Sequence, residues 1–181
     1  MIPEEKITIT LTTDPGIIAD SASMMSRSDP WITMGLGYNQ CLKAFDGTEK
    51  EIYALEIGKE VAGFVILQIG GTFKGYIQTI CVDETYRGRG FGNQLLQFCE
   101  DRILKISPNI FICVSSFNKG AIRLYEKFGF KRVGELENFV KNGFTELLLR
   151  KNGDVKLIRR AETQEDYFAT LDINGLDSFE V

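Results

Sequence analysis

The chain has 181 residues, of which 44% are hydrophobic and 25% charged, a composition typical of one globular domain rather than a disordered or fibrous protein. Its net charge of −4 argues against a nucleic-acid-binding surface, and neither a signal peptide nor a long apolar run is recognisable, so no membrane contact is expected. The absence of histidine excludes histidine-based triads and the usual zinc sites, and we expect no metal centre.

Hydrophobic periodicity indicates the first elements of the chain. Residues 6–11 alternate in hydrophobicity, as expected of a strand. Asp14-Pro15 predicts a helix N-cap with proline at the first helical position, and this helix should run to about residue 25. A short helix over 38–45 follows Trp31, which is either a core anchor or a wall of a substrate pocket.

Three strands are expected next, over 51–57, 61–69 and 75–82. The first two are joined by the tight turn Gly58-Lys59-Glu60, and Gly70-Gly71 makes a turn before the third. The middle strand is almost wholly apolar, which places it in the centre of a sheet. The sequence therefore predicts an antiparallel meander.

The connection that leaves this meander enters an amphipathic helix over 91–105. It carries three glycines on alternate positions and two arginines: Gly88, Gly90, Gly92, Arg87 and Arg89. Glycines let several backbone N–H groups converge on one point, and the helix N-terminus adds a partial positive charge there. An ordinary turn needs only one glycine, so the pattern favours a phosphate-binding loop.

After this helix comes an apolar strand over 110–115. The strand–helix–strand order is a crossover connection, so this strand should lie parallel to the last strand of the meander. Asn118 predicts the N-cap of another helix, which Gly129 should end in a left-handed cap. The last two strands flank Asn142-Gly143, a pair typical of a type I′ hairpin turn.

The four cysteines show no paired metal-binding spacing. Cys81 and Cys113 lie within apolar strands, so we expect buried free thiols in a reducing, cytoplasmic environment.

Two common phosphate-binding motifs do not fit the loop. The spacing Gly88-x-Gly90-x-Gly92 differs from the dinucleotide fingerprint, and no acidic residue ends the next strand. The Gly-Lys-Ser/Thr of a nucleotide P-loop is also missing.

What the loop does resemble is the pyrophosphate signature of the GNAT N-acetyltransferases, through Arg87-x-x-Gly90-x-Gly92 after a strand that ends Ile80-Cys81-Val82-Asp83. A second segment, residues 118–130, resembles the Asn-x-x-Ala-x-x-Leu-Tyr-x-x-x-Gly-Phe element of that family. The general form is similar to the ribosomal-protein alanine N-acetyltransferase branch.

The resemblance implies the GNAT fold for residues 1–151. This is an α/β fold with a mixed sheet of about seven mostly antiparallel strands, one splayed parallel pair, and helices on both faces. Residues 152–181 would form a C-terminal extension that packs on the core or on a partner subunit.

The resemblance also implies direct transfer of an acetyl group from acetyl-CoA, as cosubstrate, to a primary amine of a small molecule or peptide. Tyr125 would act as the acid that protonates the departing thiolate. The residues implied to bind the cosubstrate are Ile80, Cys81, Val82, Arg87, Gly88, Arg89, Gly90, Phe91, Gly92, Asn93, Asn118 and Ala121.

The general base is not identified by the resemblance. The two positions at which family members carry a catalytic glutamate are occupied here by Cys113 and Tyr76. A water chain that touches Gln78 or Thr79 is one alternative. Carboxylates of the last hairpin are another, and we expect these to be exposed surface groups: Glu135, Glu137 and Glu146.

Two other functions remain open at this point. The first is a non-catalytic acyl-CoA-binding sensor on the same fold, which the missing glutamates favour. The second is a transferase of a larger acyl group. A homodimer formed through the last strands or the C-terminal extension is a further option.

Overall fold

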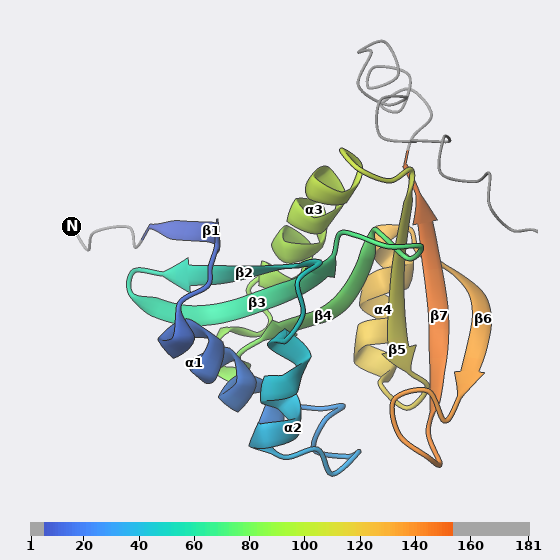
Figure 1. Ribbon diagram of the computed structural model, residues 1–181, viewed down its shortest axis with the longest axis horizontal. Helices are drawn as coiled ribbons and strands as arrows, with labels where there is room; N and C mark the ends of the chain where they lie inside the picture. Colours follow the sequence, from blue (N-terminus) through green and yellow to red (C-terminus); the bar gives the residue numbers. More distant parts are fainter. Residues whose placement is uncertain (1–5, 154–181) are drawn as a thin grey trace, which may run out of the picture.

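A computed structural model describes residues 6–153, which form one seven-stranded sheet and four α-helices (Figure 1). The strands are β1 (Ile7–Leu11), β2 (Lys50–Ile57), β3 (Glu60–Gln68), β4 (Tyr76–Val82), β5 (Asn109–Ser115), β6 (Lys131–Glu137) and β7 (Thr145–Asn152). The helices are α1 (Pro15–Ser26), α2 (Tyr38–Leu42), α3 (Phe91–Ile103) and α4 (Lys119–Phe128), with 3₁₀ turns at Lys43–Phe45 and Glu84–Tyr86. The bulk of the predicted C-terminal extension, residues 154–181, lies outside the described residues.

Local capping explains where the helices begin and end. Asp14 Oδ1 accepts hydrogen bonds from two N–H groups in the first turn of α1, at 2.8 and 3.0 Å. Asn118 Oδ1 accepts from the N–H of Ala121 at 3.1 Å and so caps α4. Gly129 ends α4 with φ of 102°, a left-handed conformation that favours glycine. All three predicted caps are confirmed.

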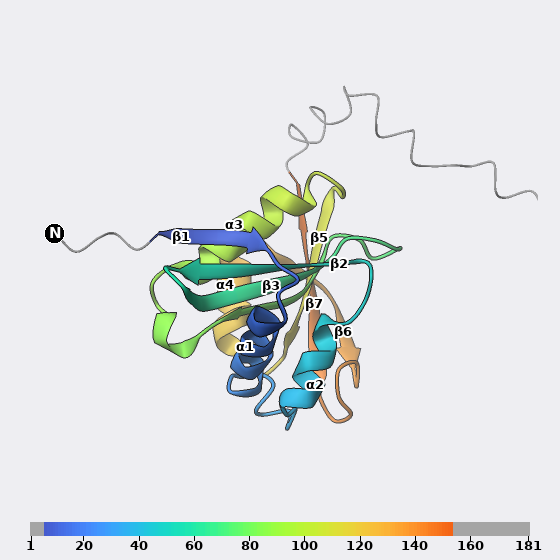
Figure 2. The same ribbon diagram turned by 60° about the vertical axis from the view of Figure 1, so that its left-hand side comes forward.

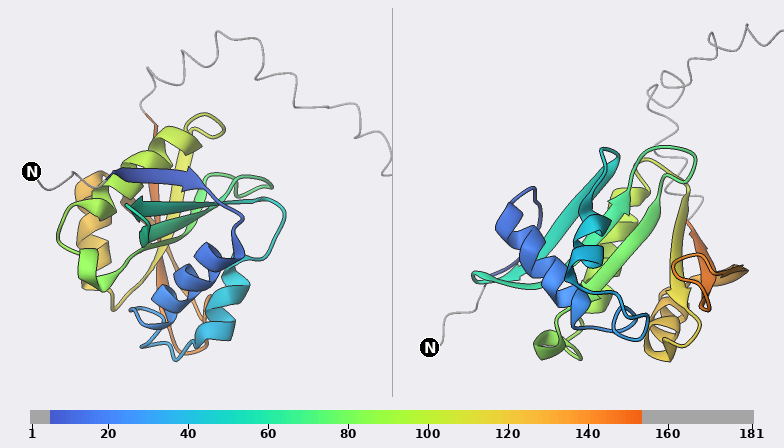
Figure 3. Two further views of the ribbon diagram at one scale, coloured as in Figure 1. Left: turned by 90° about the vertical axis from the view of Figure 1, so that its left-hand side faces the viewer. Right: turned by 60° about the horizontal axis from the view of Figure 1, so that its bottom comes forward.

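The sheet order is β1-β2-β3-β4-β5-β7-β6, and every neighbouring pair is antiparallel except β4 and β5. The predicted meander and the parallel pair are therefore confirmed. Helices cover both faces: α1 and α2 lie together on one side of β2–β4, and α3 and α4 lie on the other (Figures 2 and 3). The larger apolar core lies between the sheet and the α3–α4 layer, and a smaller one lies under α1 and α2.

The parallel strands β4 and β5 separate soon after they meet. They pair only at Tyr76 with Phe111 and at Ile77 with Ile112. Beyond that point β4 has a bulge against β3, where Gln78 is the extra residue between two paired positions. The rest of β4 continues without a partner on the β5 side, so the sheet opens into a V between these strands (Figure 3).

The hairpin between β6 and β7 differs from the predicted type I′ turn. Pairing stops at Glu137, which leaves residues 138–144 as a wider loop. Asn138 takes the left-handed conformation, with φ of 57°, whereas Asn142 does not. The reason is that Asn138 closes the loop itself: its side chain accepts from the N–H of Gly143 at 2.7 Å, and its N–H donates to Phe144 O at 2.8 Å.

Two further observations concern residues 6–153 only. None of their helices is long and apolar enough to cross a membrane, and no three of their Cys, Asp or Glu side chains are grouped to hold a metal ion. All four thiols are free, and Cys81 is buried as predicted, whereas Cys113 is only half-buried.

Candidate active site

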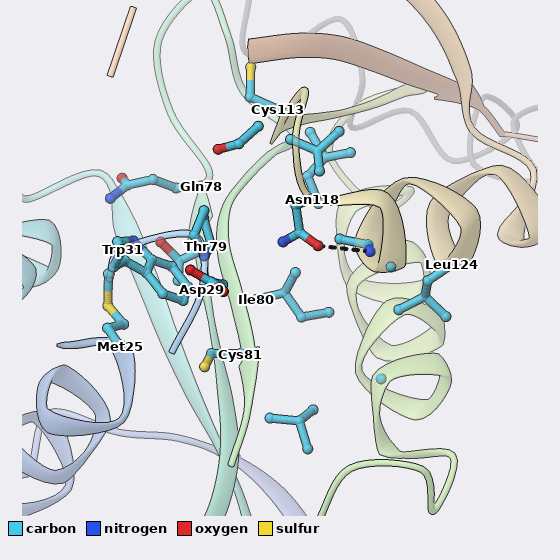
Figure 4. Close-up of a pocket in the computed structure, with 18 of the residues that line it drawn as sticks. Met25, Asp29, Trp31, Gln78, Thr79, Ile80, Cys81, Cys113, Asn118 and Leu124 are labelled. Carbon is cyan, nitrogen blue, oxygen red and sulfur yellow. Dashed lines mark hydrogen bonds between the residues drawn. The ribbon is translucent and has the colours of Figure 1, made fainter. Parts of the chain in front are cut away.

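The separation of β4 from β5 leaves a cleft of about 1110 Å³ (Figure 4). This slightly exceeds the range of roughly 300–1,000 Å³ that is usual for small-molecule sites. Side chains from both faces of the sheet line it: α4 and the loop before α3 from one face, and the α1–α2 connection from the other. The cleft therefore connects the two sides of the sheet.

The backbone of β4 supplies free hydrogen-bonding groups to this cleft. Asp83 N–H donates to Ala62 O on β3 at 2.9 Å, whereas the Val82 carbonyl points away from β3 and accepts from Arg87 Nε at 3.0 Å. Because backbone groups alternate along a strand, the N–H and C=O of Ile80 also face the gap that β5 has left. Cys81 faces β3 with its backbone and lines the cleft with its side chain.

The glycine loop before α3 is open on its concave side. Gly88 and Gly90 have φ of 76° and 87°, and a Cβ added at either would meet no atom of residues 6–153 within 4 Å. Gly90 is also the N-cap of α3, so the first N–H groups of that helix point toward the same space. Gly92 has different surroundings, because a Cβ there would lie 3.2 Å from Leu124 Cδ2 on α4, a tight contact to which that side chain would have to adjust. Phe91 and Asn93 line the cleft beside them.

The two arginines of the loop have different surroundings. Arg87 lines the cleft, and besides Val82 O it donates to Ser28 Oγ at 2.9 Å, so it ties the α1–α2 connection to the end of β4. The Arg89 guanidinium lies 5.4 Å from the centre of the Tyr86 ring, and Arg89 is not among the residues that line the cleft. The structure thus brings one of the two predicted arginines to the site.

Tyr125 of α4 and Asn118, the N-cap of that helix, both line the cleft. Tyr125 is 6% exposed, and its hydroxyl makes no hydrogen bond within residues 6–153. Burial raises the pKa of Tyr125, with smaller contributions from Cys81 and Cys99, so it remains a neutral donor at physiological pH. The amide nitrogen of Asn118 points away from α4, opposite its capping oxygen (Figure 4).

The side of the cleft under α1 and α2 is lined by Trp31, together with Met25 and Asp29 (Figure 4). Trp31 also packs, partly buried, against the smaller core, and its role in binding a substrate stays a prediction. The β6–β7 loop closes the same side, because Lys141 Nζ donates to the Met34 carbonyl in the α1–α2 connection. Phe139 in that loop is 58% exposed and lines the rim.

Glu146 on β7 is the residue that the sequence prediction misplaced. It is 4% exposed and not a surface group, it lines the cleft, and its Oε1 accepts from Ser115 Oγ at 2.6 Å. Burial raises the pKa of this carboxyl, and the Ser115 hydrogen bond partly offsets that rise. The other two carboxylates of the hairpin, Glu135 and Glu137, are exposed as expected.

Residues 19–130 match the model of the Acetyltransferase (GNAT) family. This span is more than half of the chain. The chain belongs to this family.

Two curated relatives and one solved structure illustrate the match. The chain is 28% identical over 113 residues to the N-alpha-acetyltransferase MAK3 of Arabidopsis thaliana and 30% identical over 108 residues to an N-alpha-acetyltransferase of Sulfurisphaera tokodaii. These alignments cover 58% and 52% of this chain, and only 60% and 65% of the relatives. A GNAT acetyltransferase from Elizabethkingia anophelis with acetyl-CoA bound is similar in fold, with a TM-score of 0.56, 24% identity, and coverage of 81% of this chain and 98% of that one.

The structure places Tyr76 and Cys113, the two positions that the resemblance relates to a catalytic glutamate, close together at the end of the paired stretch. Burial raises the pKa of both groups. Both are therefore neutral at physiological pH and poorly suited to take a proton. Gln78 and Thr79 line the cleft as well, with Gln78 Nε2 donating to Ala44 O at 2.9 Å.

Proposed function

We propose that the protein transfers the acetyl group of acetyl-CoA directly to a primary amine. The observation that supports this best is one continuous cleft with a glycine loop at one end, free β4 backbone groups along it, and the Tyr125 hydroxyl beside them. An extended ligand matches these features if its pyrophosphate lies at the glycine loop, its chain along β4 and its thioester beside Tyr125. A nucleotide or a small acid would use only one end of the cleft.

Acetyl-CoA would bind along the β4 side of the cleft. The N–H groups from Gly88 to Asn93 would hold the pyrophosphate, because they converge at the positive end of α3. The free N–H groups of Ile80 and Val82 would hold the pantetheine and polarise the thioester carbonyl. Such preorganised donors stabilise the oxyanion of a tetrahedral intermediate. Asn118 and Ala121 would contact the cosubstrate from α4.

The transfer itself needs one acid. The amine nitrogen attacks the thioester carbon, the C–N bond forms, and the C–S bond then breaks. Tyr125 gives its proton to the departing thiolate and regains one from the nitrogen of the new amide. A hydroxyl kept neutral by burial is suited to this role because its proton is present at physiological pH.

The acceptor would enter from the side of α1 and α2, opposite the glycine loop. The two named relatives are N-alpha-acetyltransferases, and an α-amino group of a peptide is accordingly the first acceptor class to test. The open rim at Phe139 and Trp31 provides apolar contact for residues next to that amine.

The test is to incubate the full chain with acetyl-CoA and a panel of amines that contains short peptides with free N-termini, spermidine and lysine amide. We expect free CoA thiol to be released and one acceptor class to gain a single acetyl group by mass spectrometry. Saturable binding of acetyl-CoA with no transfer to any amine would refute the proposal and favour the non-catalytic sensor.

A further inference from the structure

Glu146 stands out among the side chains of the cleft that the transfer has not used. Its side chain is almost fully buried, with 4% exposure, yet no Lys or Arg of residues 6–153 forms an ion pair with it. Its contact is the neutral hydroxyl of Ser115, the residue directly opposite on β5. A buried carboxylate without a cation is costly, and such groups concentrate at functional sites.

The position of Glu146 places it on the acceptor side of the cleft. Leu147 and Leu149 of β7 belong to the core under α3 and α4, so by strand alternation Glu146 points to the opposite face of the sheet. That is the face closed by the α1–α2 connection and the β6–β7 loop. The carboxylate and the glycine loop are therefore on opposite sides of the cleft.

The other groups around Glu146 do not neutralise it. Tyr76 on β4 and Cys113 on β5 interact with it electrostatically, and both are uncharged at physiological pH. Leu136, opposite it on β6, carries no charge. Asp29 and Lys43 line the cleft from the α1–α2 side, and neither is an ion-pair partner of Glu146.

We infer that Glu146 binds the protonated acceptor amine and takes its proton. Glu146 is then the general base, a role for which Tyr76 and Cys113 are unsuited. The inference rests on the proposed function and specifies the acceptor as a cationic primary amine. Ser115 is a positioning residue, since its hydroxyl orients the carboxylate through Oε1.

The proton balance of the step is complete. The ammonium gives one proton to the Glu146 carboxylate, which leaves a neutral amine that attacks the thioester carbon. A second proton passes from the new amide nitrogen to Tyr125 after that residue has protonated the thiolate. Glu146 returns to its carboxylate form by releasing its proton to water, so one proton is produced for each acetyl group transferred.

Burial raises the pKa of the Glu146 carboxyl, which brings its proton affinity closer to that of an amine and improves it as a base. The rate should fall as the pH decreases through this raised pKa, because the protonated carboxyl can neither bind an ammonium nor take its proton. The acid limb of kcat/KM should therefore lie above the ordinary range of a glutamate.

The test compares Glu146→Gln, which keeps the shape and removes the charge, with Glu137→Gln, which removes an exposed charge from the neighbouring strand. The first measurement is calorimetric titration of protonated spermidine and of a short peptide amine into each protein with CoA present. The second is the pH profile of kcat/KM for the best acceptor. Ser115→Ala is the third variant. Hydrazine, a weak base that is largely neutral in mildly alkaline solution, serves as an acceptor that needs no deprotonation before it attacks.

We expect Glu146→Gln to weaken amine binding at least about tenfold and to lower turnover with ammonium acceptors by about 100-fold or more, with little effect on hydrazine. Its acetyl-CoA affinity should be unchanged, as should every property of Glu137→Gln. Ser115→Ala should move the acid limb to higher pH, because it removes a hydrogen bond that lowers the pKa of Glu146.

Unchanged amine binding in Glu146→Gln would overturn the inference, and so would an acid limb that persists in that variant. Either result leaves acetyl-CoA binding and Tyr125 untouched. Conversely, failure to bind acetyl-CoA would refute the proposed function, whereas the titration with amines would still report on Glu146.

Discussion

Replacing Gly90 with alanine separates the role of the glycine loop in binding from its role in folding. Gly90 has φ of 87°, and an added Cβ would meet no atom within 4 Å in the described part of the chain, so that part accepts the methyl group without a clash. The cost to stability is then only that of a left-handed backbone, about 1–2 kcal/mol. For a domain of this size, such a loss lowers Tm by about 2–8 °C.

The matched control is Gly58→Ala in the β2–β3 hairpin. Gly58 also has a left-handed conformation, with φ of 64°, and a Cβ there likewise meets nothing within 4 Å. Both variants should lose similar stability in thermal melts. Only Gly90→Ala should lose affinity for acetyl-CoA, by at least about tenfold or 1.4 kcal/mol, because its methyl group occupies the space where the pyrophosphate would sit.

Calorimetric titration with acetyl-CoA is the assay, carried out well below both melting temperatures. If Gly90→Ala and Gly58→Ala bind acetyl-CoA equally well, the loop does not hold the pyrophosphate.

Three other predictions follow from the site. Tyr125→Phe should lower kcat by about 100-fold and leave the Kd of acetyl-CoA unchanged; turnover at the wild-type rate would remove Tyr125 from the mechanism. Because burial raises the pKa of Tyr125, wild-type kcat should not fall on the alkaline side below about pH 10, and an inflection near pH 9 that disappears in Tyr125→Phe would contradict this. Arg87→Ala should lower Tm and weaken acetyl-CoA binding, because it removes the hydrogen bonds to Val82 O and Ser28 Oγ. Arg123→Ala, on the exposed side of α4, should do neither. Equal effects of the two substitutions would refute the bridging role of Arg87.

The parts of the fold that the sequence predicted well depend on neighbouring residues. The caps at Asp14, Asn118 and Gly129 arise from hydrogen bonds or dihedral angles within a few positions. The strands are recognisable from alternating hydrophobicity, and the parallel pair follows from the crossover connection through a helix. The glycine loop was recognisable because the spacing of its glycines is a local pattern that the sequence shows directly.

What the sequence did not predict depends on contacts between distant residues. Glu146 follows a turn and precedes an apolar run, as many exposed strand residues do. Its burial requires β7 to lie between β5 and β6, and the β6–β7 loop to meet the α1–α2 connection, where Lys141 and Met34 are 107 positions apart. The prediction of a type I′ turn at Asn142-Gly143 was wrong for a related reason, since Asn138 closes a wider loop around the pair. The proposed homodimer and the packing of residues 152–181 stay predictions.

The measurement that tests the central claim most directly is calorimetric titration of the full chain with acetyl-CoA, with desulfo-CoA and NADH titrated in parallel. The cleft predicts saturable binding of both CoA compounds, since they share the pyrophosphate and pantetheine, and no binding of NADH, which lacks the pantetheine. If neither CoA compound binds, or if NADH binds as well as they do, the cleft is not an acetyl-CoA site and the proposed acetyl transfer must be abandoned.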